Sequence, residues 1–101
     1  MKLVLLPQAQ RDIEAAVRFT QRRWARTVAV RLEGRIQDAI ARIEQSPAQG
    51  RLRSEYGRPG LRFALVDPFF LIYRAEPLEA LRFVHARRDL GAVVEDLGDG
   101  N

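Results

Sequence analysis

Three short apolar runs follow one another in the second half of the chain, and a turn containing proline separates each run from the next. Residues 61–66 alternate, which is typical of a strand with one buried face. On this spacing Leu61, Phe63 and Leu65 share one face, and Arg62 and Ala64 share the other. Residues 69–73 are apolar on both faces, as expected for a central strand.

The third run, residues 80–87, ends in a cluster of His and Arg. Alternation predicts one face made of Leu81, Phe83, His85 and Arg87, and an opposite face made of Arg82, Val84 and Arg88. The turns at 67–68 and 76–79 are short enough to join antiparallel neighbours. The three runs together predict a small antiparallel sheet with a cationic rim at the end of its last strand.

The first half of the chain has helical periodicity. Residues 2–6 are a short apolar run, which we interpret as a strand, and Pro7 suits the first turn of the helix that follows. From Gln8 to about Trp24, apolar positions recur at helical spacing. They are Ile13, Ala16, Val17, Thr20 and Trp24, with Phe19 off the stripe.

A second helix is predicted after almost no loop, with Thr27 as its cap and Ser46–Pro47 as its end. Its apolar stripe consists of Val28, Leu32, Ile36, Ala39, Ile40 and Ile43. Two helices joined this closely form an antiparallel hairpin, whose remaining apolar face needs a sheet to cover it. Residues 48–59 are expected to be a loop.

The predicted fold is therefore an α+β domain, with an N-terminal strand and an α-helical hairpin packed on a small antiparallel sheet in the order β-α-α-β-β-β. A chain of 101 residues supports a single domain, 1–101. Residues 91–101 carry three acids and no base. We expect them to form an acidic tail that is frayed beyond about Leu97.

The positive net charge of the chain indicates an acidic partner. The net charge is +4, but residues 1–89 carry +7, and sixteen of the seventeen basic residues are Arg. The positive charge of residues 1–89 favours nucleic acid or an acidic protein as partner. The alternative is that these arginines only form a solvated surface and bind no partner. The sequence has no Cys, and its N-terminal apolar run is too short for a signal peptide or a membrane span. We therefore expect a cytoplasmic protein with no membrane partner.

Five short motifs, in order over about 90 residues, carry a family resemblance. They are Ala9 with Asp12-Ile13, Ser46-Pro47, Gly60-Leu61-Arg62, Ile72-Tyr73-Arg74, and residues 84–89 with the sequence Val-His-Ala-Arg-Arg-Asp. Together they resemble the RelE/ParE superfamily of bacterial type II toxin–antitoxin toxins, with the ParE branch the closer match.

The resemblance implies a growth-inhibiting toxin that a cognate antitoxin neutralises, and contact with operator DNA through that antitoxin. A ParE-like member binds and inhibits DNA gyrase without chemistry. A RelE-like member cleaves mRNA on the ribosome, and a degenerate toxin retains only antitoxin binding. No cofactor is implied, and one His with no Cys and no clustered carboxylates gives no metal site.

The resemblance places the target-binding rim at Arg62, His85, Arg87 and Arg88. A nuclease would use Arg62 and Arg87 for phosphate and His85 for proton transfer. RelE-like nucleases use basic lysines, and several carry a C-terminal aromatic residue as acid or base. The chain has no Lys after Lys2 and no Tyr after Tyr73, which weighs against RNA cleavage. The residues alone leave structural roles open: His85 bonded at the sheet end, Arg62 paired with Asp89 or Glu55, and Arg87 or Arg88 paired with Asp89.

Phe19 and Trp24 have two interpretations. By pattern they are core residues, although a large aromatic residue near a helix end is also a common interface anchor. In the superfamily the antitoxin crosses the helical pair and the sheet, so the resemblance makes Phe19 and Trp24 candidate antitoxin-binding residues.

Overall fold

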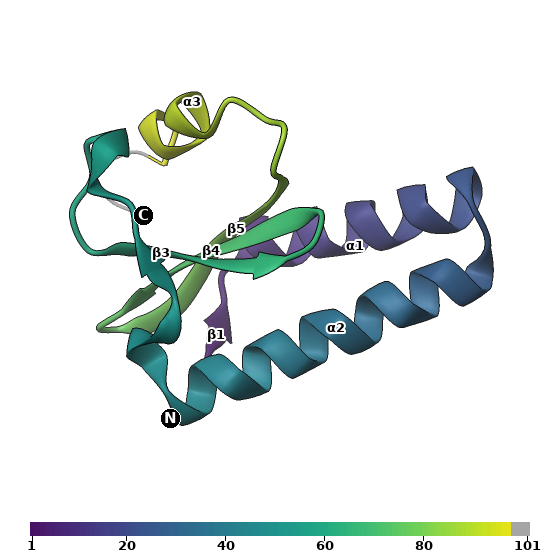
Figure 1. Ribbon diagram of the computed structural model, residues 1–101, viewed down its shortest axis with the longest axis horizontal. Helices are drawn as coiled ribbons and strands as arrows, with labels where there is room; N and C mark the ends of the chain where they lie inside the picture. The colour runs from purple at the N-terminus through teal and green to yellow at the C-terminus, as the bar shows by residue number, and fades with distance from the viewer. Residues whose placement is uncertain (98–101) are drawn as a thin grey trace.

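The computed structural model describes residues 1–97, in which a helical hairpin and a short C-terminal helix lie on opposite sides of a sheet (Figure 1). The helices are α1 (Pro7–Arg23), α2 (Arg26–Gln45) and α3 (Leu90–Glu95). The strands are β1 (Val4–Leu5), β2 (Arg51–Leu52), β3 (Leu61–Val66), β4 (Phe69–Ala75) and β5 (Leu78–His85). Two short 3-10 turns, η1 (Pro47–Gln49) and η2 (Ser54–Tyr56), flank β2. The predicted α+β class and the order of its main elements are confirmed.

Within these residues the strands form one sheet in the order β1-β5-β4-β3-β2. β3, β4 and β5 are antiparallel, as predicted, whereas β1 runs parallel to β5 through Val4 and Leu5. β2 lies inside the stretch 48–59, which was predicted to be a loop, and both of its residues pair with β3. Its two residues are too few to give a periodic signal.

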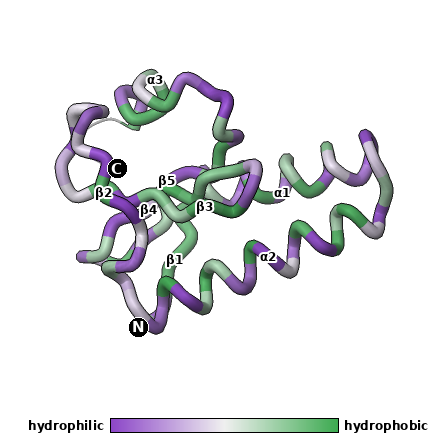
Figure 2. Tube along the Cα trace, viewed as in Figure 1, coloured by the Kyte–Doolittle hydropathy of each residue, from purple (hydrophilic) through white to green (hydrophobic). Residues whose placement is uncertain are grey.

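Hydrophobic side chains fill both faces of the sheet. The face under the helical hairpin buries the α2 stripe together with Leu71, Tyr73 and Phe83. Figure 2 shows hydrophobic positions recurring along α2 between hydrophilic ones, which is the amphipathic pattern that this packing requires. Of the stripe predicted for α2, Leu32, Ile36, Ala39 and Ile43 are buried, and Val28 and Ile40 are half-buried.

The C-terminal segment corrects the expectation of a tail from residue 91. Asp89 caps α3, because its Oδ1 accepts a hydrogen bond from the Ala92 N–H at 3.1 Å. Val93, Val94 and Leu97 are buried against the second face of the sheet, beside Leu61, Phe63 and Ile72. The frayed part expected beyond Leu97 lies outside the described residues.

A β-bulge corrects the faces predicted for β5. Ile72 pairs with Arg82 but Tyr73 pairs with Ala80, so Leu81 is the additional residue. Leu81 therefore lies with Val84 on the α3 side, and Phe83 lies on the helical-hairpin side. Strict alternation had placed Leu81 and Phe83 together.

The caps of the helical hairpin differ in part from the prediction. Pro7 is the first residue of α1 and Ser46 follows the last residue of α2, as predicted. α2 begins at Arg26, after Ala25, and no side chain caps it, so the assignment of Thr27 as the cap was wrong.

Candidate functional site

The predicted rim begins where β5 ends, at His85. The His85 ring is half-buried and lies edge-on to the Phe69 ring, with 5.4 Å between centroids, and Phe69 stacks on Phe83 at 4.8 Å. His85 Nδ1 accepts a hydrogen bond from the Arg87 backbone N–H at 3.0 Å, so the neutral ring carries its proton on Nε2. This bond links the His85 ring to the turn after β5.

Arg87 and Arg88 lie in that turn, not in the strand. The Arg88 N–H donates to the His85 carbonyl at 2.9 Å, and the Ala86 N–H donates to the Pro68 carbonyl at 2.8 Å. In the described part of the chain both arginine side chains are exposed and form no ion pair. Pairing with Asp89 was wrong, because that carboxylate caps α3. Two adjacent cations thus face solvent beside the end of β5, in a hydrophilic turn (Figure 2).

The Arg62 side chain forms hydrogen bonds within the protein. Its Nη1 donates to the carbonyl oxygens of Ala48 at 3.0 Å and Gly50 at 2.8 Å, which holds the segment after α2 against β3. The alternative partner Glu55 pairs with Arg53 at 2.9 Å, and this hydrogen bond lowers the pKa of Glu55. Arg62 also lines an open cleft of 790 Å³ with Arg58 and Arg74.

Of the three residues that a nuclease would use, Arg62 lies apart from His85, whereas Arg87 lies next to His85 in the turn after β5. Arg62 pairs across the sheet with Tyr73, whereas His85 pairs with Phe69, four residues earlier in β4. At the rise of a strand this separates them by roughly 13 Å along the sheet, and two strand spacings add roughly 10 Å across it. Arg62 and His85 therefore cannot hold one phosphate and its proton donor together in this structure.

The far end of the helical hairpin presents exposed aromatic side chains. Phe19 is 57% exposed and Trp24 is 65% exposed, so their interpretation as core residues was wrong. The Arg23 guanidinium lies over the Trp24 ring, 4.6 Å from its centroid. The C-terminal end of α1 and the N-terminal end of α2 extend beyond the sheet (Figure 1), which explains why Phe19 and Trp24 are exposed in the described structure.

A sequence model of the family described as the ParE toxin of the type II toxin–antitoxin system, parDE, matches residues 3–90. The chain belongs to this family. Among solved structures, it is similar to a chain of the "Chromosomal ParDE TA system from P. aeruginosa", at 22% identity and a TM-score of 0.68. That match covers 84% of this chain and 95% of the other, and it supports the RelE/ParE-like fold. No curated protein sequence gave a match.

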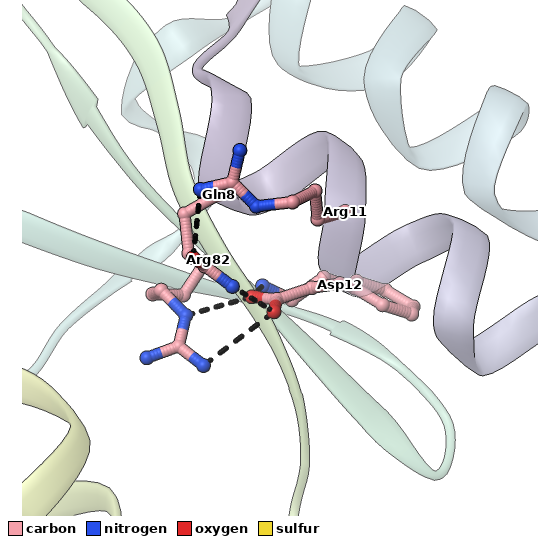
Figure 3. Close-up of polar contacts among 5 residues, drawn as sticks. Gln8, Arg11, Asp12 and Arg82 are labelled. Atoms are coloured by element: carbon pink, nitrogen blue, oxygen red, sulfur yellow. Dashed lines mark hydrogen bonds and ion pairs between the residues drawn. The ribbon is translucent and has the colours of Figure 1, made fainter.

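The structure accounts for the Ala9 and Asp12 pattern of this ParE-family chain. Ala9 is fully buried against the sheet. One turn later Asp12 Oδ2 accepts hydrogen bonds from Arg82 Nε at 2.7 Å and from the Phe83 backbone N–H at 3.0 Å (Figure 3). Gln8 Nε2 donates to Asp12 Oδ1 at 2.8 Å. Asp12 thus occupies the edge of β5 beyond the end of β1 and fixes α1 to the sheet.

Tyr73 also joins distant segments of the chain, whereas the sequence predicted only that it lies in a strand. Its hydroxyl donates to the Pro47 carbonyl at 2.8 Å and accepts from the Gly50 N–H at 2.8 Å. Burial raises the pKa of this phenol. Because these partners are more than twenty residues away, no local pattern could have revealed the contact. Together with Arg62, it fixes the segment between α2 and β2.

No helix within residues 1–97 is both long enough and apolar enough to span a bilayer.

Proposed function

We propose that this chain is the toxin of a toxin–antitoxin pair, that it inhibits DNA gyrase by binding, and that a cognate antitoxin neutralises it. Membership of the ParE family supports the toxin role. The observation that favours binding over chemistry is the separation of Arg62 from His85 at opposite ends of β4. We place this activity in the cytoplasm, where gyrase acts.

Within this proposal, Arg87 and Arg88 contact the target, because they are the rim cations that face solvent without an ion pair in the described structure. His85 and Arg62 act as positioning residues: one holds the turn after β5, and the other holds the segment before β2. Guanidinium groups suit acidic surfaces because each offers several donors in a fixed plane.

Phe19 and Trp24 are proposed to contact the antitoxin. Both side chains are large, aromatic and more than half exposed at the end of the helical hairpin. Exposed aromatic residues of this kind often contribute much of the binding energy at protein interfaces. The charge of +7 over residues 1–89 favours an acidic antitoxin. Operator DNA would be reached through that antitoxin.

Reversing the two rim charges tests the target contact. We expect Arg87→Glu/Arg88→Glu to raise the concentration needed to inhibit gyrase supercoiling about tenfold, because two favourable charges become repulsive. Arg18→Glu/Arg22→Glu, on the exposed face of α1, makes the same charge change and should stay within about twofold of wild type. Equal inhibition by the rim variant and the wild type would remove Arg87 and Arg88 from the interface.

The same preparations separate the alternatives. Added to translating ribosomes with a defined mRNA, the protein should leave the mRNA intact. Codon-spaced cuts that disappear in His85→Ala would establish the RelE-like endonuclease instead. A protein that leaves both gyrase and mRNA unaffected, and whose expression never slows growth, would be a degenerate toxin that retains only antitoxin binding.

A further inference from the structure

Three large apolar side chains are exposed at the tip of the helical hairpin. Trp24 lies in the connection between α1 and α2, Phe19 precedes it in α1, and Val30, which is 54% exposed, follows it in α2. At the rise of a helix, Phe19 and Val30 lie within roughly 8 Å of this connection along the helix axes. Apolar side chains gathered at one end of a molecule indicate a contact site.

The same segment is strongly basic. Residues 19–31 contain no acid and four arginines, which are Arg22, Arg23, Arg26 and Arg31, so their net charge is +4. All four arginine side chains are exposed and form no hydrogen bond or ion pair within the described residues. The Arg23 guanidinium contacts the Trp24 ring, so apolar and cationic groups are in direct contact. We call residues 19–31 the hairpin-tip surface.

The hairpin-tip surface projects from the body of the protein, because the two helix ends extend beyond the sheet (Figure 1). Glu14 and Glu33 are the acids of α1 and α2 nearest to the tip in sequence. Each lies roughly 10 Å or more from the end of its helix along the axis. The tip can therefore meet a flat surface end-on with apolar side chains and guanidinium groups, and with no carboxylate of residues 19–31.

We propose that the hairpin-tip surface binds the face of a bilayer that contains anionic lipids. Phe19, Trp24 and Val30 enter the boundary between headgroups and acyl chains, which interfacial segments enter to a depth of about 5–10 Å. The guanidinium groups bind lipid phosphates, because each offers several donors in one plane, and their aliphatic stems pack beside the apolar side chains. A Trp side chain, with its apolar body and polar N–H, is typical of this boundary.

A bilayer is a better fit than nucleic acid or a second copy of this chain. Nucleic acid could bind the arginines and stack on Phe19 and Trp24, but it gives no apolar contact for the aliphatic Val30. Two copies of a surface with a charge of +4 repel each other. The sequence-based expectation of no membrane partner rested on the lack of a signal peptide or spanning segment, and a peripheral contact needs neither.

The proposal does not rest on the gyrase target. Phe19 and Trp24 are also proposed to contact the antitoxin, so lipid and antitoxin cannot occupy the hairpin-tip surface together. A supercoiling reaction contains no lipid, so the comparison of charge variants in that reaction is unaffected by this contact. Failure of either proposal therefore leaves the other standing.

Trp24 is the sole Trp of the chain, so tryptophan fluorescence reports directly on the hairpin-tip surface. The probe is a unilamellar vesicle of equal parts phosphatidylcholine and phosphatidylglycerol, added to the full-length protein at low salt. We expect a blue shift of the Trp24 emission, together with sedimentation of the protein with the vesicles. Vesicles of phosphatidylcholine alone should produce neither effect, because they carry no net charge.

Two charge-reversal variants make the test specific to the tip. Arg23→Glu/Arg26→Glu should weaken vesicle binding at least about tenfold, because two attractive charges become repulsive. Arg35→Glu/Arg42→Glu makes the same charge change nearer the other end of α2, and should stay within about threefold of wild type. Phe19→Ser keeps the fluorescent reporter and should also weaken binding. All substituted side chains are exposed, and circular dichroism confirms that each variant is folded.

The proposal is overturned if the anionic vesicles leave the Trp24 emission unchanged, whether or not the protein sediments with them. It is also overturned if the Arg23→Glu/Arg26→Glu variant binds as tightly as the Arg35→Glu/Arg42→Glu variant. An oligonucleotide that shifts the Trp24 emission at a lower phosphate concentration than the vesicles would make this a nucleic-acid surface, and would overturn the proposal as well.

Discussion

Replacing Asp12 with alanine should lower the free energy of unfolding by about 3 kcal/mol, one of the two largest effects that we expect from a single substitution in this chain. Two groups lose their acceptor together: the Arg82 guanidinium and the Phe83 backbone N–H. The Arg82 and Asp12 side chains are only 16% and 11% exposed, so water replaces the lost carboxylate poorly. An unpaired, largely buried cation then remains beside the sheet.

Urea denaturation measures this loss as a lower midpoint at an unchanged slope. Asp12→Asn should be intermediate, because its amide oxygen still accepts from the Phe83 N–H while its NH₂ group repels Arg82. Asp38→Ala removes an exposed carboxylate that forms no ion pair within residues 1–97, and should change stability by less than about 0.5 kcal/mol. An Asp12→Ala protein as stable as the Asp38→Ala control would show that Asp12 does not hold α1 to β5.

Gly50→Ala is expected to cost about 3 kcal/mol for a steric reason. The backbone itself accepts alanine, since φ is −67°. The added Cβ would lie 2.5 Å from the Tyr73 hydroxyl oxygen and 2.6 Å from its Cε1, closer than such atoms approach. The ring must move, and the buried hydrogen bonds to Pro47 and Gly50 break with it.

Gly34→Ala is the matched control. Gly34 lies inside α2, and a Cβ added there would have no atom of another segment within 4 Å. Alanine at this position should therefore stabilise the protein by about 1 kcal/mol through helix propensity. Thermal unfolding should shift in opposite directions for the two Gly→Ala variants. In a Tyr73→Leu background the penalty of Gly50→Ala should shrink, and an undiminished penalty would place its cause outside the Tyr73 ring.

Periodic elements were predictable from the sequence because their pattern repeats. α1, α2, β3 and β4 each contain enough residues for a 3.6-residue or two-residue period, and Pro7 and Pro47 mark helix ends. The sequence does contain an indication of α3, because Leu90, Val93, Val94 and Leu97 have helical spacing. Gly91 and three acids concealed it, because the composition of this segment resembles that of a tail.

Contacts between distant segments were not predictable. The bulge at Leu81 depends on the pairing of β4 with β5 and leaves no periodic trace. The partners of Arg62, the carbonyls of Ala48 and Gly50, are backbone groups that no side-chain pattern reveals. Similarly, the sequence does not show whether Arg87 and Arg88 pair with Asp89, because the role of Asp89 as the cap of α3 depends on the fold. The sequence thus predicted which residues make up the rim, but their exposure and hydrogen bonds required the fold.

The most direct test of binding rather than chemistry is a titration of this protein against a fixed amount of DNA gyrase in a supercoiling reaction, with a defined mRNA and translating ribosomes assayed in parallel. We predict that inhibition requires toxin in amounts comparable to the gyrase present, while the mRNA remains intact. Full supercoiling in excess toxin, accompanied by mRNA cleavage at substoichiometric toxin, would contradict the account.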